Sequence, residues 1–190
     1  MSGLRERKKL ATRQALSWAA LRLATERGLE NVHVEDIAAA AGVSPRTYNN
    51  YFPSKEAAIC GIAVDRGERI SAELLARPAG EPLAEALLAA VMAQYEQAGE
   101  PDREWVARTR LVTSSPALRG EFLKALAVTE QSLADAIARR RGDDGLFPGV
   151  LAAMVTGATR VGVDHWFAGD TGESFLTVVA AAVRMALAGI

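Results

Sequence analysis

Apolar residues recur at helical spacing along almost the whole chain, and this pattern limits the folds available to it. Near the N-terminus, Leu16, Ala19, Ala20, Leu23 and Ala24 occupy one face of a helix with about 3.6 residues per turn. No alternating apolar and polar run is bounded by turn residues in the way that a half-buried strand requires. The sequence therefore predicts an all-α protein.

Glycine, proline and serine residues mark where the predicted helices begin and end. Gly28 and Gly42 follow apolar stretches as stop signals, Ser44 and Ser54 have the position of N-caps, and Pro45 suits a first helical turn. We therefore expect helices at residues 5–27, 34–41, 45–52, 55–74, 83–98, 102–112, 116–141, 148–168 and 172–188.

The composition is that of an ordinary globular protein. Of the 190 residues 49% are hydrophobic and 24% are charged, and the longest unbroken apolar run covers the eight residues 86–93. A membrane helix needs about 20 apolar residues, and the basic N-terminus lacks the apolar core of a signal peptide. We therefore expect a cytoplasmic protein with no membrane partner. With one cysteine and two histidines, we also expect no metal site and no cofactor.

The charges are unevenly distributed. Residues 1–60 hold nine Lys and Arg against six Asp and Glu, whereas residues 61–190 hold thirteen against seventeen. Five of the basic residues lie within the first thirteen positions, where Glu6 is the single acid. A basic N-terminal segment suits a polyanionic partner such as DNA, and the alternative is a solvated terminal segment without a partner.

The two short helices at residues 34–41 and 45–52 have the proportions of a helix-turn-helix motif. Gly42 can adopt the left-handed conformation of a tight turn, and the second helix carries Arg46, Asn49 and Asn50. Arginine and asparagine are the side chains that pair bidentately with guanine and adenine edges in the major groove. Lys55 begins the following helix, where an ammonium group and free backbone N–H groups suit a DNA phosphate. These features favour a DNA-binding function.

Residues 13–58, and above all AAAAGVSPRTYNNYFPSKEA from Ala38 onward, resemble the TetR family of bacterial transcriptional regulators. The resemblance implies an all-α homodimer, with a three-helix DNA-binding domain at residues 1–54 and an effector-binding and dimerisation domain at residues 55–190. The resemblance also implies that Ser44, Pro45, Arg46, Thr47, Tyr48, Asn50, Tyr51 and Lys55 lie on or beside the DNA surface. The basic segment adds Arg7 and Lys8 to the predicted DNA-binding residues, and the second helix of the motif adds Asn49.

Two positions depart from the family pattern. Asn49 stands where the family commonly has an aromatic residue, which either removes a usual DNA contact or adds base readout. His33 stands where the second helix is usually capped by threonine, and it is a weaker cap. The substitution at Asn49 keeps an alternative open, namely a small-molecule-binding helical protein that no longer binds DNA.

Most of the aromatic residues follow residue 60, where they can line a pocket for an apolar effector. The stretch 108–112 with residues 116–118 looks similar to an actinobacterial branch of the family with an acyl-CoA-like effector domain, so acyl-CoA or another apolar compound is the expected ligand. Arg108, Arg110 or the run 139–141 are candidates for an anionic head group. Ordinary core packing and a solvated helix end are the alternatives. The predicted effector-binding residues are Tyr95, Trp105, Arg108, Leu111, Phe122, Leu126, Thr129 and Trp166.

The last two predicted helices carry a surface of small residues suited to pairing with a second copy of the chain. The alternative is packing within the chain. The predicted dimer-interface residues are Ala153, Gly157, Val161, Val179, Ala182, Val183 and Ala186.

Together these features predict a ligand-responsive repressor of a palindromic operator, released by a small apolar or acyl-type effector. We expect no catalytic residues. A helical enzyme that uses His165 beside Asp164 is a further alternative, but adjacent residues on a helix point about 100° apart.

Overall fold

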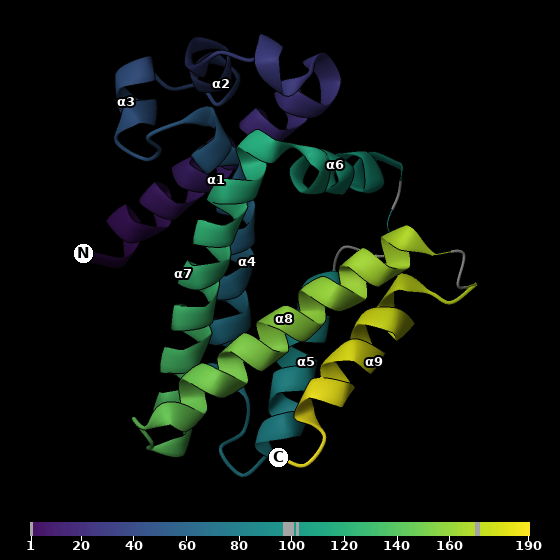
Figure 1. Ribbon diagram of the computed structural model, residues 1–190. Helices are drawn as coiled ribbons and strands as arrows, with labels where there is room; N and C mark the ends of the chain where they lie inside the picture. Colours follow the sequence, from purple (N-terminus) through teal and green to yellow (C-terminus); the bar gives the residue numbers. More distant parts are fainter. Residues whose placement is uncertain (1, 97–100, 102, 170–171) are drawn as a thin grey trace. The chain divides into compact units, whose positions relative to one another are not determined.

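The computed structural model describes residues 2–96, 101, 103–169 and 172–190, and within these ranges it contains helices and no strands (Figure 1). The prediction of an all-α fold is therefore confirmed. The chain divides into two compact units. Unit 1 comprises Met1–Asp65 and Arg103–Ala125, and unit 2 comprises Arg66–Asp102 and Leu126–Ile190. Two long helices, α4 (Lys55–Ala76) and α7 (Pro116–Arg141), each contribute residues to both units.

Unit 1 is built around the N-terminal helix. Its elements are α1 (Ser2–Arg27), the short 3-10 helix η1 (Leu29–Asn31), α2 (Val34–Ala40), α3 (Pro45–Asn49), α6 (Arg103–Ser114) and the first parts of α4 and α7. The apolar stripe of α1 packs on the inner faces of α2, α3 and α4, so its residues are buried as the periodicity predicts. The core includes Leu16, Ala20, Leu23, Ile37, Tyr48, Ile59 and Leu118.

Local hydrogen bonds define the short helices of unit 1. Gly42 has a φ of 69° between α2 and α3, a left-handed conformation that favours glycine. The Ser44 hydroxyl accepts a hydrogen bond from the Thr47 amide at 3.1 Å and so caps α3. The Ser54 hydroxyl accepts from the Ala57 amide at 3.0 Å and caps α4 in the same way. Side-chain caps that sequence alone indicates therefore fix both ends of the α3 segment.

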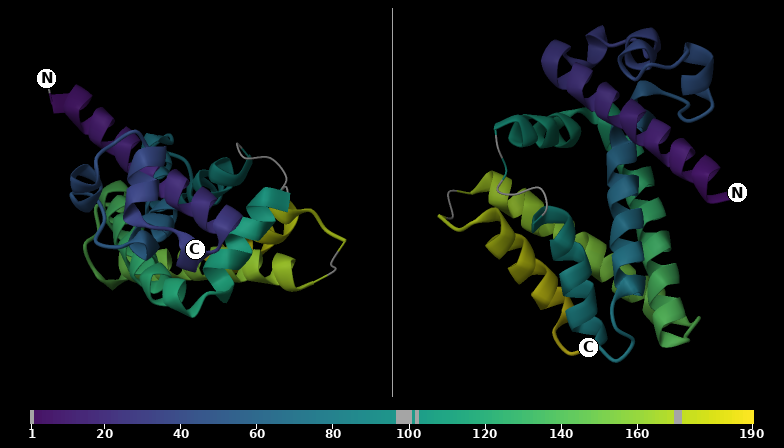
Figure 2. Two further views of the ribbon diagram at one scale, coloured as in Figure 1. Left: turned by 90° about the horizontal axis from the view of Figure 1, so that it is seen from above. Right: turned by 180° about the vertical axis from the view of Figure 1, so that it is seen from behind.

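In unit 2, α5 (Leu83–Glu96) and α8 (Leu146–Ala168) pack against α9 (Phe175–Leu187), and Figure 2 shows α8 and α9 side by side in both views. A Cβ atom on Gly162 of α8 would lie 3.0 Å from the Ala182 Cβ and 3.2 Å from the Val179 Cα. The glycine therefore permits the close approach of α8 and α9. A second close approach joins α4 to α7, where Thr129 leaves no room for a side chain on Gly67.

Several predicted helix bounds differ from the structure, and each difference has a local cause. The third helix ends at Asn49 rather than at residue 52, because Asn50 is already its C-cap. The last helix begins at Phe175 rather than at residue 172, because Gly172 has a φ of 66° and Ser174 is the N-cap. Helix α8 begins two residues before Pro148, which its first turn accommodates. The predicted end of the fifth helix, at residue 98, lies outside the described residues.

We predict opposite stability effects for two glycine substitutions in helices. Gly162→Val should lower the free energy of unfolding by about 1–3 kcal/mol, because the added methyl groups overpack the contact with α9. Gly120→Ala on the exposed face of α7 should raise it by about 0.8–1 kcal/mol, because nothing lies within 4 Å of the new methyl group. Urea unfolding of the two variants measures both effects. Equal stability of Gly162→Val and the parent protein would contradict the close α8–α9 packing.

Candidate nucleic-acid interface and effector region

Helix α3 has one buried and one exposed face. The Tyr48 side chain is 0% exposed, whereas Arg46, Asn49 and Asn50 are exposed on the opposite side. The exposed side chains are those that can hydrogen-bond to base edges in a major groove. The structure therefore brings together the three predicted residues with the clearest chemistry for base recognition.

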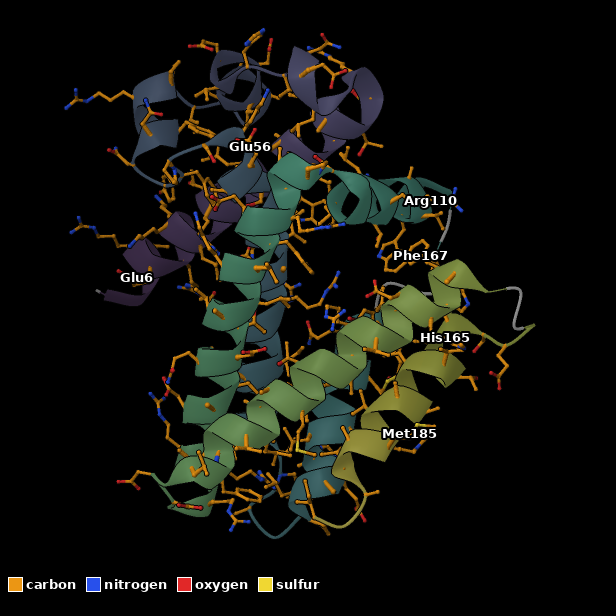
Figure 3. All side chains as sticks on the ribbon, viewed as in Figure 1. Glu6, Glu56, Arg110, His165, Phe167 and Met185 are labelled. Carbon is orange, nitrogen blue, oxygen red and sulfur yellow. The ribbon has the colours of Figure 1, made fainter. Side chains whose placement is uncertain are left out.

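The structure corrects the placement of Tyr48, which the sequence predicts among the DNA-binding residues. Its hydroxyl donates a hydrogen bond to the Ser54 carbonyl oxygen at 2.7 Å, and its ring packs against Phe52 with centroids 6.1 Å apart. Burial, and secondarily the negative charge of Glu56, raises the pKa of Tyr48 to about 12. Tyr48 thus supports α3 from the core side and joins it to the start of α4, where Figure 3 labels Glu56.

The other predicted residues around α3 are partly engaged in local structure. The Ser44 hydroxyl caps the helix and also lies 2.9 Å from the Thr47 hydroxyl. Pro45 is exposed at the first helical position, and Thr47 and Tyr51 are half-buried. These residues shape and orient the segment, and they remain predicted DNA contacts.

Lys55 joins the start of α4 to the segment that precedes α2. Its Nζ atom donates hydrogen bonds to the carbonyl oxygens of Leu29 at 2.6 Å and Val32 at 2.9 Å. An ammonium group has three donors, so one remains for a phosphate. The sequence predicts the phosphate contact but not this structural role, because the two acceptors are backbone atoms that carry no sequence signal.

The predicted basic residues near the N-terminus lie on a helix. Arg7 and Lys8 are exposed on α1, which begins at Ser2, and Arg7 Nε donates to the Gly3 carbonyl at 3.1 Å. Figure 3 labels Glu6 on the same segment. The basic side chains are therefore presented from a helix and not from an irregular arm.

An ion pair that the sequence does not predict joins α1 to α4. Arg13 pairs with Asp65, whose side chain is 5% exposed, and the Arg13 guanidinium also lies 5.6 Å from the centroid of the Phe52 ring. Removing one partner of a buried pair leaves an uncompensated charge and typically costs about 3–5 kcal/mol. The only sequence signal is a lone aspartate on an otherwise buried helix face, and nothing in the sequence identifies its partner.

The eight predicted effector-binding residues are divided between the two units. Trp105, Arg108, Leu111 and Phe122 belong to unit 1, where the Arg108 guanidinium lies 5.4 Å from the Trp18 ring centroid. The remaining four belong to unit 2, and two of these, Tyr95 and Trp166, join a cluster of aromatic rings described below. Thr129 packs against Gly67, and Leu126 is half-buried on α7.

In unit 2, aromatic rings of α5, α8 and α9 form a continuous series, which we call the aromatic cluster: Tyr95, Phe175, Trp166 and Phe167. Consecutive centroids are 5.3 to 5.4 Å apart, and each pair meets edge to face. Tyr95 and Phe175 are buried, while Trp166 and Phe167, the latter labelled in Figure 3, are partly exposed. Such a cluster can contact an apolar ligand.

The structure corrects part of the predicted dimer interface. Val179 and Val183 are 0% exposed, because α9 buries them within its own chain. Gly157, Ala182 and Ala186 are half-buried, and Ala153 and Val161 are exposed. The exposed apolar face of α8 and α9, which we call the α8–α9 face, also includes three residues that the sequence does not single out: Val150, Met154 and Met185. Figure 3 labels Met185 on this part of α9.

Among the described residues, one helix is long and apolar enough to cross a membrane, and it is α8. This finding differs from the expectation that no segment is long and apolar enough to span a membrane. Only 28% of the apolar stretch of α8 is buried within the chain. The exposed remainder includes the α8 part of the α8–α9 face.

His165 is exposed near the end of α8, and the neighbouring Asp164 carboxylate accepts a hydrogen bond from Arg160 at 3.0 Å. Asp164 is therefore engaged with another helix residue and not with His165. Among the described residues, no group of His, Cys, Asp and Glu side chains is arranged to hold a metal ion.

A helix-turn-helix segment in an N-terminal unit with a second helical unit defines a class of bacterial DNA-binding regulators. The sequence model described as "Bacterial regulatory proteins, tetR family" matches residues 18–57, and the model described as "MftR C-terminal domain" matches residues 81–190. The HTH-type transcriptional regulator TcmR of Streptomyces glaucescens is 37% identical over 176 residues, which cover 87% of this chain and 77% of TcmR. The chain belongs to the TetR family of transcriptional regulators, a regulatory and not an enzymatic family.

Solved structures share the fold at lower identity. FadR of Bacillus subtilis in complex with stearoyl-CoA is 21% identical with a TM-score of 0.57, and the match covers 93% of this chain and 98% of FadR. SmeT of Stenotrophomonas maltophilia, in a complex with triclosan, is 19% identical with a TM-score of 0.58, covering 94% of this chain and 90% of SmeT. At these identities the likeness shows the fold alone.

Tyr48→Phe should lower the free energy of unfolding at neutral pH, and the difference from the parent protein should shrink at alkaline pH. At neutral pH we expect a loss of about 0.5–1.5 kcal/mol for the hydrogen bond to Ser54. Because the pKa of Tyr48 rises from 10.0 to about 12 on folding, the folded state retains this proton longer than the unfolded state does. Its stabilising effect is complete below pH 10 and is lost as the pH rises towards 12.

Denaturant unfolding at several values between pH 9 and pH 12 measures the difference between Tyr48→Phe and the parent protein. The stability of the parent protein relative to Tyr48→Phe should fall by up to about 1.4 kcal/mol per pH unit between pH 10 and pH 12, so the gap closes and then reverses sign. The buried Cys60 titrates in both proteins and cancels in the comparison. A gap that stays constant with pH would contradict the buried, protonated state of Tyr48.

Proposed function

We propose that the protein is a ligand-responsive repressor that binds a palindromic operator as a homodimer and is released by a small apolar or acyl-type effector. The observation that carries the proposal is that α3 buries Tyr48 on one side and exposes Arg46, Asn49 and Asn50 on the other. An operator lies on the chromosome, so this function places the protein in the bacterial cytoplasm.

Base recognition in this proposal comes from α3, and affinity comes largely from phosphate contacts. Arg46 is suited to guanine, and Asn49 and Asn50 are suited to adenine. The exposed basic residues of α1 and the remaining donor of Lys55 are suited to phosphates, which position the protein without reading sequence. Asn49 is exposed, so we assign it to base readout and not to a lost contact.

A single α3 of five residues reaches too few bases for a specific site, so the proposal requires two copies. In helix-turn-helix dimers the two recognition helices read half-sites about 34–36 Å apart. The α8–α9 face supports this assembly, because Val161 is 53% exposed and Met185 is 78% exposed in the single chain. Apolar side chains of this size are typically covered in a stable dimer.

The aromatic cluster supports an apolar effector. Among the structural neighbours, FadR binds stearoyl-CoA, which carries a long apolar acyl chain, and SmeT binds triclosan, which is largely apolar. Effector binding releases DNA if it favours a state in which the two α3 helices no longer match their half-sites. A coupling of about 1–3 kcal/mol would lower DNA affinity by about 5-fold to 150-fold.

Substitution of Arg46 tests the DNA-binding surface. Arg46→Ala should reduce the affinity for a selected operator by about 1–3 kcal/mol and relax the base preference at one position in each half-site. The matched control is Arg22→Ala, which removes the same charge from the exposed surface of α1, where Arg22 pairs with Glu26. Fluorescence anisotropy with labelled duplexes measures both variants.

The salt dependence of binding, measured in the same assay, reports on the phosphate contacts, which do not depend on DNA sequence. If the dimer neutralises about eight phosphates, log affinity should fall with log salt concentration with a slope near −7. A slope near zero, or equal affinities of Arg46→Ala and the parent protein, would count against the proposed interface.

Substitution of Gly157 tests the dimer. Among the described residues, nothing beyond the neighbouring backbone of α8 lies within 4 Å of a Cβ built on Gly157, so an arginine there leaves the single chain intact. Gly157→Arg should convert the dimer to a monomer by placing a charge within the α8–α9 face. Gly120→Arg on α7, also in open space, is the control and should stay dimeric. Light scattering after size-exclusion chromatography gives the masses, and a dimeric Gly157→Arg would contradict the assignment of this face.

A further inference from the structure

Two arginines on α4 lie together in unit 2, and their contacts differ from those of an ordinary surface ion pair. Arg66 lies over the Tyr95 ring at 5.1 Å from its centroid, with Nη1 3.5 Å from the Tyr95 hydroxyl oxygen. Arg69 Nε donates a hydrogen bond to Gln94 Oε1 at 2.8 Å. Neither guanidinium forms an ion pair with a carboxylate in the part of the chain that the structure describes.

The position of these side chains is electrostatically unfavourable. Residues three apart on a helix are neighbours on its surface, and two like charges at this spacing destabilise the helix. Partial desolvation, and secondarily the positive charge of Arg66, lowers the pKa of Arg69, whereas the neighbouring Glu68 acts in the opposite direction and the Arg69 side chain is exposed. A bound anion would relieve the repulsion and complete the hydrogen bonding of two planar guanidinium groups, which match carboxylate and phosphate geometry.

The aromatic cluster continues directly from this pair. Tyr95, which Arg66 contacts, meets Phe175, and Phe175 meets Trp166. The cationic pair therefore adjoins the buried end of the aromatic cluster, which reaches a partly exposed ring at Trp166. That combination fits an amphiphilic molecule with an acidic group and an apolar body.

We propose that Arg66 and Arg69 bind the acidic group of the effector, a carboxylate or a phosphate, while the aromatic cluster contacts its apolar part. This inference rests on the proposed function, in which a small molecule binds unit 2. It excludes a neutral apolar compound as the preferred ligand.

Two of the arginines that the sequence suggests for this role, Arg140 and Arg141, are engaged elsewhere. Arg140 donates four hydrogen bonds, to the carbonyl oxygens of Leu74, Arg77, Pro78 and Glu81, and so fixes the connection between α4 and α5. Arg141 pairs with Asp143 and lies 4.1 Å from the centroid of the Phe147 ring.

The anion site is also placed to affect unit 1 through the helix itself. Arg66 directly follows Asp65, and Asp65 forms the buried ion pair with Arg13 of α1. A ligand that reorients Arg66 acts on the same turn of α4 that holds α1. The inference thus assigns the starting point of DNA release as well as the chemical class of the ligand.

Three probes with the same tail test the proposal: dodecanoate, dodecyl phosphate and dodecanol, each below its micelle concentration. Isothermal titration of the full-length protein should show at least about 10-fold tighter binding of one anionic probe than of dodecanol. The anionic probe that binds more tightly distinguishes a carboxylate ligand from a phosphate ligand. Equal affinity for all three, or no binding of any, would overturn the proposal.

Variants then locate the site. Arg66→Gln and Arg69→Gln should each weaken the anionic probe by about 10-fold to 100-fold and leave the dodecanol affinity unchanged. Arg184→Gln, which removes an exposed charge from α9 in the same unit, is the control and should bind like the parent protein. Loss of dodecanol binding in step with the anionic probe, or the same loss in Arg184→Gln, would overturn the assignment. Circular dichroism of each variant verifies that it is folded.

Operator binding separates this inference from the proposed function. If the arginine variants lose selectivity for the anion while no probe displaces operator DNA from the parent protein, the anion site stands and the release mechanism fails. If DNA is displaced equally well by dodecanol and by the anionic probes, release by an apolar effector stands and the anion site fails.

Discussion

The burial of the Tyr48 side chain is the constraint on which the DNA-binding surface depends. A helix of five residues is too short to be stable by itself, so α3 must be held by contacts outside it. Its N-terminus is held by the Ser44 cap, and its inner face is held by Tyr48, which hydrogen-bonds to the backbone at Ser54. Because these contacts use one face only, the opposite face is free to carry Arg46 and the two asparagines.

Helix α4 connects the two chemical environments of the protein. Its first residue, Lys55, binds the backbone near α2, and Asp65 pairs with α1, so its N-terminal part is fixed within unit 1. From Arg66 onward its contacts belong to unit 2, including the hydrogen bond that the Ser71 hydroxyl accepts from Ser132 at 3.0 Å. A ligand-driven change in the second set of contacts can therefore reach the first along one helix, which is the physical basis of the proposed regulation.

The parts of the fold and of the site that sequence predicts depend on signals within a few residues. Ser44, Pro45 and Gly42 fix the turn through their own caps and backbone conformation, so the amino-acid sequence alone places the helix-turn-helix. Contacts between distant segments carry no such local signal. The pairing of Arg13 with Asp65 depends on how α1 packs against α4. The small residues of α9 suit packing within the chain and packing against a second copy equally, so the prediction that Val179 lies in the dimer interface is wrong. The sequence also does not indicate the proposed anion-binding role of Arg66. That role depends on its three-dimensional surroundings, in which it lies over the Tyr95 ring and pairs with no acid among the described residues.

Selection of bound sequences from random duplex DNA tests most directly whether α3 reads bases twice per assembly. We expect an enriched palindrome whose half-sites are about 10 base pairs apart, and no such enrichment when Arg46, Asn49 and Asn50 are all replaced by alanine. A selected pool without a common sequence, or the same palindrome enriched by the triple variant, would contradict this reading of the interface.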